Sequence, residues 1–279
     1  MRNLASVSSA PIAKLGDRQY YDLVGTLEVM GKLHRESAVD GFELQLEPEW
    51  DGENPPLTDA HLADWTKTPK HSFKEILDLV RSEGLPILSV HASRDIGSYL
   101  CSDRERDLGK GKRLIYDSLR LTSGLGADIC VFHLWDTRKE ELDITRLRRT
   151  LLDIAPHFPE VKASVENVPT HLKGSTPFDL LQIFDYLTLD LRWAAFYKEL
   201  DAFESIVDRI VNVHLRGRLE EEKWILDQSS FDFYEALDKI KNVWRYSGLF
   251  TIEPEGNMDS SCFRRFVRSV NSLKARMDE

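Results

Sequence analysis

The sequence predicts an α/β protein of the (β/α)8 TIM barrel class, built as a single domain over residues 1–279. Three observations predict this class: short apolar runs alternate with amphipathic segments, the alternation continues to the end of the chain, and no linker interrupts it. A chain of 279 residues is an ordinary length for one such barrel. An open, doubly wound sheet is the alternative, but no glycine-rich phosphate turn follows the first predicted strand.

The predicted strands are apolar runs of four to six residues, several of them rich in β-branched side chains, as is typical of buried parallel strands. A weaker run at residues 4–7 would supply the first strand. The clear runs lie at residues 42–46, 85–90, 129–132, 161–165, 186–189, 210–213 and 249–252.

Helical segments separate these runs. Apolar side chains recur at helical spacing in residues 73–80, 147–154 and 263–273. Ser175 provides a capping hydroxyl just before Pro177, a pattern that predicts the start of a further helix.

Composition and charge narrow the function. The net charge is −10 and the sequence pI is about 5.4, so wholesale nucleic-acid binding is disfavoured, although a local basic groove is compatible with it. No apolar stretch approaches the roughly 18 residues of a membrane span, and the first residues are too polar for a signal peptide. The three cysteines, Cys101, Cys130 and Cys262, are too scattered for a disulfide framework or a metal clip. We therefore expect a cytoplasmic protein with no membrane partner.

Polar residues fall at the ends of the predicted strands. The carboxyl ends of barrel strands converge on one mouth, where active sites lie, so these side chains would meet in one cleft. A single His or Glu at a strand end is more often a hydrogen-bonded structural residue, but six at equivalent positions favour a metal site. Nitrogen and oxygen ligands without thiolate suit Mn²⁺, Mg²⁺, Zn²⁺ or Co²⁺. The six residues are His91, His133, Glu166, Asp190, His214 and Glu253.

These strand-end motifs resemble those of the xylose isomerase-like barrels, which include sugar isomerases and epimerases, inosose dehydratases and the endonuclease IV branch. The resemblance covers about residues 38–275, and the order and register of its motifs make it fairly specific. The matching motifs lie at residues 40–44, 90–92, 132–133, 165–167, 189–190, 213–215 and 251–253.

The resemblance implies roles for the strand-end residues. Glu166 and Glu253 would also be the catalytic acid and base, and His91 and His133 would line the substrate side of the cleft. Barrels of this family often pair, so a homodimer is an open alternative to a monomer. The implied metal ligands are Glu166, Asp190, His214 and Glu253.

Two positions depart from the family pattern. The family has Asp-x-x-His after the sixth strand, whereas this chain has Asp190 followed by Trp193, whose indole offers one donor and no acceptor. The family often has an aspartate two residues after the seventh-strand histidine, where this chain has Arg216. Endonuclease IV-type enzymes hold their third zinc with these two regions, so three-zinc phosphodiester cleavage is disfavoured.

Secondary candidates surround the predicted cleft. Arg216 and Arg218 could bind an anionic group of the substrate, with a solvated loop charge as the alternative. Trp193 and Trp135 could form an apolar wall against the sugar carbons, with core packing as the alternative. Glu43 has the opposite parity to its apolar neighbours, so it could face the barrel interior and form a structural hydrogen bond there.

The sequence therefore favours a metal-dependent isomerase or epimerase of a small sugar or polyol that works by enediolate proton transfer. A dehydratase-type lyase or a metal hydrolase on the same barrel is one alternative. A barrel that has lost catalysis and serves in binding is another, and Trp193 and Arg216 are the residues that favour it.

Overall fold

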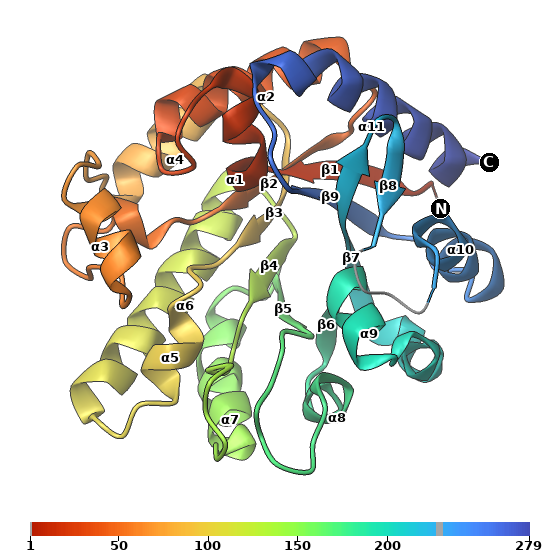
Figure 1. Ribbon diagram of the computed structural model, residues 1–279. Helices are drawn as coiled ribbons and strands as arrows, with labels where there is room; N and C mark the ends of the chain where they lie inside the picture. Colours follow the sequence, from red (N-terminus) through yellow and green to blue (C-terminus); the bar gives the residue numbers. More distant parts are fainter. Residues whose placement is uncertain (1, 227–230) are drawn as a thin grey trace. The chain divides into compact units, whose positions relative to one another are not determined.

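The computed structural model describes residues 2–226 and 231–279, in which strands and helices alternate along the chain (Figure 1). Contacts within the chain group it into two compact units, one of Met1–Glu43 with Thr188–Glu279 and the other of Leu44–Leu187. The division passes through β2 (Gly41–Gln45) and β6 (Tyr186–Asp190). The expectation of a single domain over residues 1–279 stays a prediction.

The first unit contains parallel strands from both ends of the sequence. β1 (Leu4–Ser8) pairs in parallel with β2 and with β9 (Leu249–Glu255), and β7 (Ile210–Glu220) pairs in parallel with the other edge of β9. The short β8 (Lys223–Ile225) folds back antiparallel on the end of β7. The parallel strands bury both faces, as their apolar residues require.

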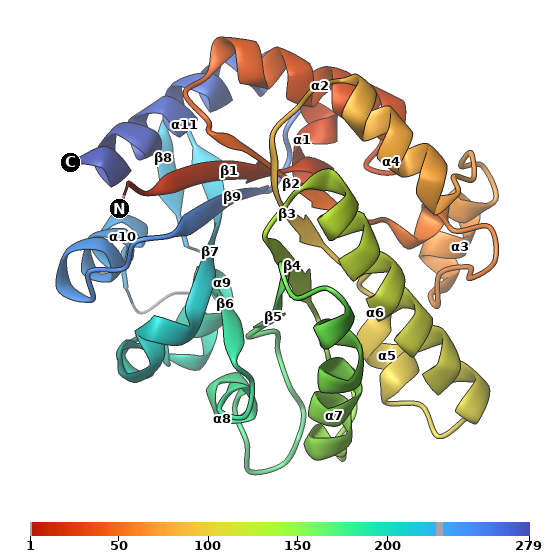
Figure 2. The same ribbon diagram turned by 180° about the vertical axis from the view of Figure 1, so that it is seen from behind.

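Two long helices of the first unit, α2 and α11, lie side by side in Figures 1 and 2. The Asn271 side chain accepts a hydrogen bond from the backbone of Ala38, and the Lys32 ammonium lies 3.9 Å from the Phe263 ring centre. The helical segments of this unit are α1 (Ser9–Ile12), η1 (Ala13–Gly16), α2 (Leu23–Glu36), α9 (Leu191–Tyr197), η4 (Leu200–Arg209), α10 (Phe233–Asp238), η5 (Lys239–Val243), η6 (Ser260–Cys262) and α11 (Phe263–Asp278).

The second unit is built on three parallel strands, β3 (Ile87–His91), β4 (Ile129–Phe132) and β5 (Lys162–Glu166). Its longest helix, α6, runs beside α5 in Figure 2. The helical segments of this unit are η2 (Pro48–Trp50), α3 (Asp59–Trp65), α4 (Phe73–Ser82), α5 (Ile96–Leu100), α6 (Glu105–Leu125), α7 (Ile144–Ile154), η3 (Ala155–His157) and α8 (Pro177–Leu181).

The α8 helix begins one residue later than the capping pattern predicts. Its cap is Thr176 rather than Ser175, because Pro177 occupies the first helical turn and its neighbour therefore takes the capping position. The Thr176 hydroxyl accepts from the backbone of Asp179, and the Asp179 carboxylate accepts from the backbone of Thr176.

The strands follow the order β6-β5-β4-β3-β2-β1-β9-β7-β8, and a further pairing joins β6 to β7. Together with the helices between the parallel strands, this order is that of a (β/α)8 barrel, which confirms the predicted fold class. The weak run at residues 4–7 is a strand, as expected. The strand predicted at residues 210–213 is much longer, because its polar second half pairs with β8 and with the end of β9. No helix in the described part of the chain has the length and apolar character needed to span a bilayer.

Candidate active site

In the first unit, polar residues gather on β2, β6, β7 and β9. Glu43, Asp190 and His214 are fully buried, Glu253 is 4% exposed, and the side chain of Arg216 is 18% exposed. The register of neighbouring parallel strands determines which residues are paired, and the side chains of a pair lie next to each other on the same face of the sheet. Arg216 is directly paired with Glu253 in the register of β7 and β9.

The imidazole of His214 lies between two carboxylates. Its Nε2 atom is 3.3 Å from Oε2 of Glu43, and its Nδ1 atom is 3.4 Å from Oε1 of Glu253. Acidic groups on both sides fix the orientation of the ring, as second partners of metal-binding histidines commonly do. Glu43, which the sequence offered only as a secondary candidate, is therefore a direct neighbour of His214 in the site.

A chain of hydrogen bonds supports Glu43 from within the sheet. Asn212 donates to Oε2 of Glu43 over 3.1 Å, and Thr251 donates to the Asn212 side-chain oxygen over 2.9 Å. The Thr251 hydroxyl also lies 2.7 Å from that of Ser6. Asn212 was not among the residues singled out from the sequence, and Thr251 was given only as part of the motif at residues 251–253. The sequence spacing could have indicated both residues. Each lies two positions before a predicted ligand, and residues two apart in a strand point to the same face.

Arg216 forms ion pairs with two of the predicted metal ligands. Its Nε atom donates to Oε2 of Glu253 over 2.7 Å and lies 3.0 Å from Oδ2 of Asp190, and its Nη2 atom also contacts Glu253. A fixed guanidinium thus supplies positive charge to carboxylates that a metal ion would otherwise neutralise. Arg216 was predicted to bind an anionic substrate group, but its guanidinium lies on protein carboxylates.

Asp190 and Trp193 belong to one local structure. Asp190 caps α9, because its Oδ1 atom accepts a hydrogen bond from the backbone of Trp193 over 3.1 Å. The first turn of the helix therefore sets the position of Trp193, whose ring centre is 5.9 Å from Cζ of Arg216 and 4.8 Å from Cζ of Arg192. The two residues that depart from the family pattern, Trp193 and Arg216, are thus neighbours.

The second unit brings together His91, His133 and Glu166. The Nε2 atoms of both histidines lie 3.2 Å from Oε2 of Glu166, and the two rings meet edge to face with centres 4.7 Å apart. Nδ1 of His91 lies 3.0 Å from the carbonyl of Ala92, which can only accept. That ring must therefore donate through Nδ1, and its Nε2 contact is a hydrogen bond only when the imidazole or Glu166 carries an additional proton.

The donor chemistry of both clusters fits a divalent ion. In each cluster, one imidazole or carboxylate atom per residue lies within 4.8 Å of the others, and nearly all of these residues are buried. Nitrogen and oxygen donors of this kind suit Mn²⁺, Mg²⁺, Zn²⁺ or Co²⁺. The two clusters are Glu43–His214–Glu253 in the first unit and His91–His133–Glu166 in the second.

Two secondary candidates have structural partners. Trp135 is 2% exposed and its indole donates to the carbonyl of Pro169 over 3.0 Å, as expected of a core residue. Arg218 pairs with Glu220 at the start of the β7–β8 hairpin.

Comparison with known proteins identifies solved structures that share this fold. No known family profile and no curated protein sequence matches the chain. Among solved structures, a sugar phosphate isomerase/epimerase from Parabacteroides distasonis has a TM-score of 0.64 at 15% identity, over 100% of this chain and 98% of the other. D-allulose 3-epimerase from Methylomonas sp. has a TM-score of 0.63 at 14% identity, over 100% and 98%. Endonuclease IV from Thermus thermophilus has a TM-score of 0.55 at 17% identity, over 98% and 100%.

These three proteins are xylose isomerase-like TIM barrels, so the resemblance expected from the strand-end motifs is confirmed at the level of the fold. Two of these structures are named as a sugar phosphate isomerase/epimerase and a sugar epimerase and the third as an endonuclease, so the same architecture is found with different named activities. The function of this chain must therefore be argued from its own site residues.

Proposed function

We propose that this protein is a divalent-metal-dependent isomerase or epimerase of a small sugar or polyol. The observation that carries the proposal is the buried group of Asp190, His214 and Glu253 on the neighbouring strands β6, β7 and β9, with Glu43 orienting the imidazole. The sugar epimerases and isomerases among the similar structures support this reaction class. A D-allulose 3-epimerase of the same fold has been solved in complex with D-allulose, which makes a small sugar the natural first substrate to test.

Glu166, Asp190, His214 and Glu253 would hold the ion, as the resemblance implies. When bound, the ion supplies positive charge that favours loss of a proton from the carbon next to a carbonyl group. Glu253 would exchange a proton with the substrate carbon, and the resemblance implies Glu166 as the second acid or base. Of these two, Glu253 is 4% exposed, so little water reaches its carboxylate.

Metal analysis and isotope exchange test this proposal together. The purified protein should retain Mn²⁺, Mg²⁺, Zn²⁺ or Co²⁺ after dialysis, measured by plasma mass spectrometry. With metal, it should incorporate solvent deuterium into at least one member of a panel of ketopentoses and ketohexoses. A protein that neither retains nor takes up any divalent ion would refute the proposal.

A Glu253→Gln variant separates chemistry from folding. The amide preserves the size of the side chain but cannot accept the proton, so deuterium exchange should be lost while the circular dichroism spectrum stays that of the wild type. Glu220→Gln is the matched control, because Glu220 is exposed on the β7–β8 hairpin and pairs with Arg218. Exchange retained in the Glu253→Gln variant would exclude Glu253 as the acid or base.

Arg216 favours a second candidate, a barrel that binds a ligand without catalysis. Its guanidinium already compensates Asp190 and Glu253, so these carboxylates have a cationic partner without a metal ion. Saturable binding of a sugar by a metal-free protein that shows no deuterium exchange would support this alternative. Release of water or of a cleaved product would instead point to a lyase or hydrolase.

A further inference from the structure

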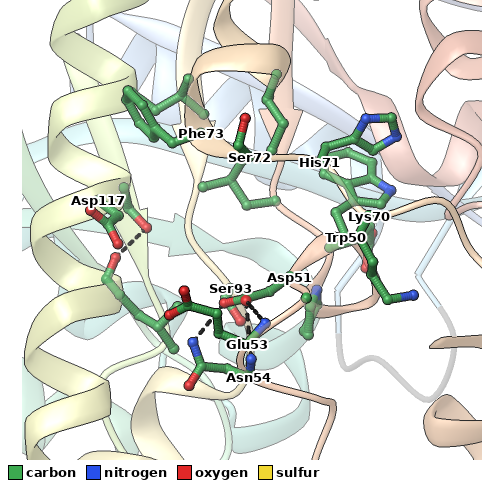
Figure 3. Close-up of a pocket in the computed structure, with 18 of the residues that line it drawn as sticks. Trp50, Asp51, Glu53, Asn54, Lys70, His71, Ser72, Phe73, Ser93 and Asp117 are labelled. Carbon is green, nitrogen blue, oxygen red and sulfur yellow. Dashed lines mark hydrogen bonds between the residues drawn. The ribbon is translucent and has the colours of Figure 1, made fainter. Parts of the chain in front are cut away.

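The second unit contains a cavity of about 620 Å³ that no part of the proposed reaction uses (Figure 3). Its walls come from residues 46–54 after β2, the first turn of α4, the segment after β3 and one face of α6. This volume lies within the range of small-molecule sites, roughly 300–1,000 Å³. All of the residues that line it belong to the second unit.

One part of the lining is aromatic and aliphatic. Trp50 is 2% exposed and Tyr99 is 4% exposed, and Phe73, Ile76 and Leu121 complete the apolar surface. The backbone carbonyl of Trp50 accepts from the amide of His71 over 3.0 Å, which ties the loop after β2 to the segment just before α4. Aromatic faces of this kind bind apolar groups and attract cations.

Much of the remaining lining consists of acidic side chains, and burial disfavours the ionised form of several of these carboxyl groups. Burial raises the pKa of Glu47 to about 7 although Arg94 lies 2.5 Å from its carboxylate and opposes the shift. Burial is also the main cause that raises the pKa of Asp95 and of Asp117. For Asp117, the nearby carboxylates of Asp51 and Glu53 add to the rise, so the cationic neighbours do not fully compensate the negative charge here.

Cationic side chains at the cavity are engaged with other groups. Arg113 pairs with Glu53 over 3.2 Å. Lys70, which also lines the cavity, donates to the carbonyl of Thr68 over 2.6 Å, and its ammonium lies 4.5 Å from the ring centre of Trp65. Burial lowers the pKa of His71, which favours its neutral form. Arg113 and Arg120 act on Asp117 through their charge, and Cζ of Arg120 lies 4.9 Å from the ring centre of Phe73, but the described hydrogen bonds include none from a cationic side chain to Asp117.

Other acidic side chains of the lining serve the local backbone. Asp51 accepts from the amides of Glu53 and Asn54, and Glu75 completes the capping box of α4 with Ser72. In Figure 3, Asp117 and Phe73 lie on one side of the cavity and Trp50 on the other. The site thus offers a half-buried carboxylate beside an aromatic enclosure.

We propose that this cavity binds an organic cation, a primary amine that carries an apolar group, with the ammonium at Asp117 and the apolar group against Phe73, Trp50 and Tyr99. An ammonium compensates a carboxylate that burial leaves poorly solvated, while the apolar group removes hydrophobic surface from water. A carboxylate or phosphate ligand would instead meet repulsion from Asp117.

Benzylamine is a suitable probe, with benzyl alcohol and benzoate as its neutral and anionic counterparts. We expect saturable binding of benzylamine to the full chain, about tenfold or more tighter than that of either counterpart, a difference of about 1.4 kcal/mol. Two-dimensional ¹H–¹⁵N spectra should show the largest shifts at the Trp50 indole and at amides in residues 113–121. Equal binding of benzylamine and benzyl alcohol, no saturable benzylamine binding, or shifts confined to other segments would overturn the proposal.

An Asp117→Asn variant tests the recognition directly. Since burial disfavours the charged form of Asp117, the neutral amide should leave the protein folded, which its melting temperature checks. We expect benzylamine to bind about tenfold more weakly to this variant, with benzyl alcohol binding unchanged. The control is Glu105→Gln, since Glu105 lies on the same helix but outside the cavity. Benzylamine affinity that is the same in the Asp117→Asn variant as in the wild type would refute the assigned contact.

Discussion

The Nε atom of Arg216 donates a 2.7 Å hydrogen bond to Oε2 of Glu253, directly across the pairing of β7 and β9. Glu253 is both a predicted metal ligand and a predicted acid or base. Because of this hydrogen bond, the negative charge of its carboxylate is partly compensated by the Arg216 guanidinium. The same guanidinium lies 3.0 Å from Asp190. Binding of a divalent ion at these carboxylates must therefore compete with Arg216, and several measurable consequences depend on this contact.

Replacing Arg216 with methionine should strengthen metal binding. The variant keeps an apolar chain near Trp193 and removes the competing charge, so we expect about tenfold higher affinity for Mn²⁺ in calorimetric titration, about 1.4 kcal/mol. Arg218→Met is the matched control, because Arg218 pairs with Glu220 and does not contact Glu253 in the described interactions. Affinity that falls or stays the same in the Arg216→Met variant would show that the guanidinium is no competitor.

Glu43 should tune the site without touching the substrate. A Glu43→Gln change retains a side-chain oxygen for Asn212 but removes the negative charge beside His214. Loss of such a second partner typically lowers metal affinity by about 10- to 100-fold, and we expect a loss in this range for Mn²⁺. Calorimetry measures the affinity and urea denaturation checks the fold. An unchanged affinity would mean that Glu43 is only a structural residue.

Asp190 caps α9 and is also a predicted metal ligand, and two variants can separate these two roles. Asp190→Asn keeps an acceptor for the Trp193 backbone and should preserve the cap of α9, whereas Asp190→Ala removes the cap at a cost of about 1 kcal/mol. Both variants lose the charge that the metal requires, so both should bind Mn²⁺ poorly. Urea denaturation and calorimetry are the measurements. If the two variants were equally stable, the capping contact would contribute nothing to the fold.

Glu47 should make the stability of the protein depend on pH. Burial raises its pKa to about 7 in the folded protein, from a value near 4.5 in the unfolded chain. The folded state therefore holds the proton more tightly, so this contribution is complete below pH 4.5 and is lost as the pH rises towards 7. The difference amounts to about 3 kcal/mol at most.

Urea denaturation of the wild type and a Glu47→Gln variant at pH 5 and pH 8 measures this contribution. The amide does not titrate, so the wild type should lose more stability between the two pH values than the variant does. Glu53→Gln is a suitable control, because Glu53 is exposed on the same loop. The same pH dependence in the wild type and in the Glu47→Gln variant would contradict the raised pKa.

The sequence predicted the fold class and most strand positions because these depend on local patterns. Runs such as residues 129–132 and 249–252 are apolar enough to be identified alone, and polar residues at their ends mark the side of the barrel where a site can form. His214, Asp190 and Glu253 were identified in this way, and the structure brings them together in the first unit. The polar second half of β7 was missed, because its pairing with β8 and β9 carries no apolar signal.

What the sequence by itself determined is the class of barrel and the residues at the ends of its strands. Only the tertiary structure decided what those residues contact. The register of β7 on β9 sets Arg216 against Glu253, and the Asp190 cap of α9 sets Trp193 near the same guanidinium. Strand register is a relation between segments distant in the sequence, fixed by packing across the sheet, and no local periodicity encodes it.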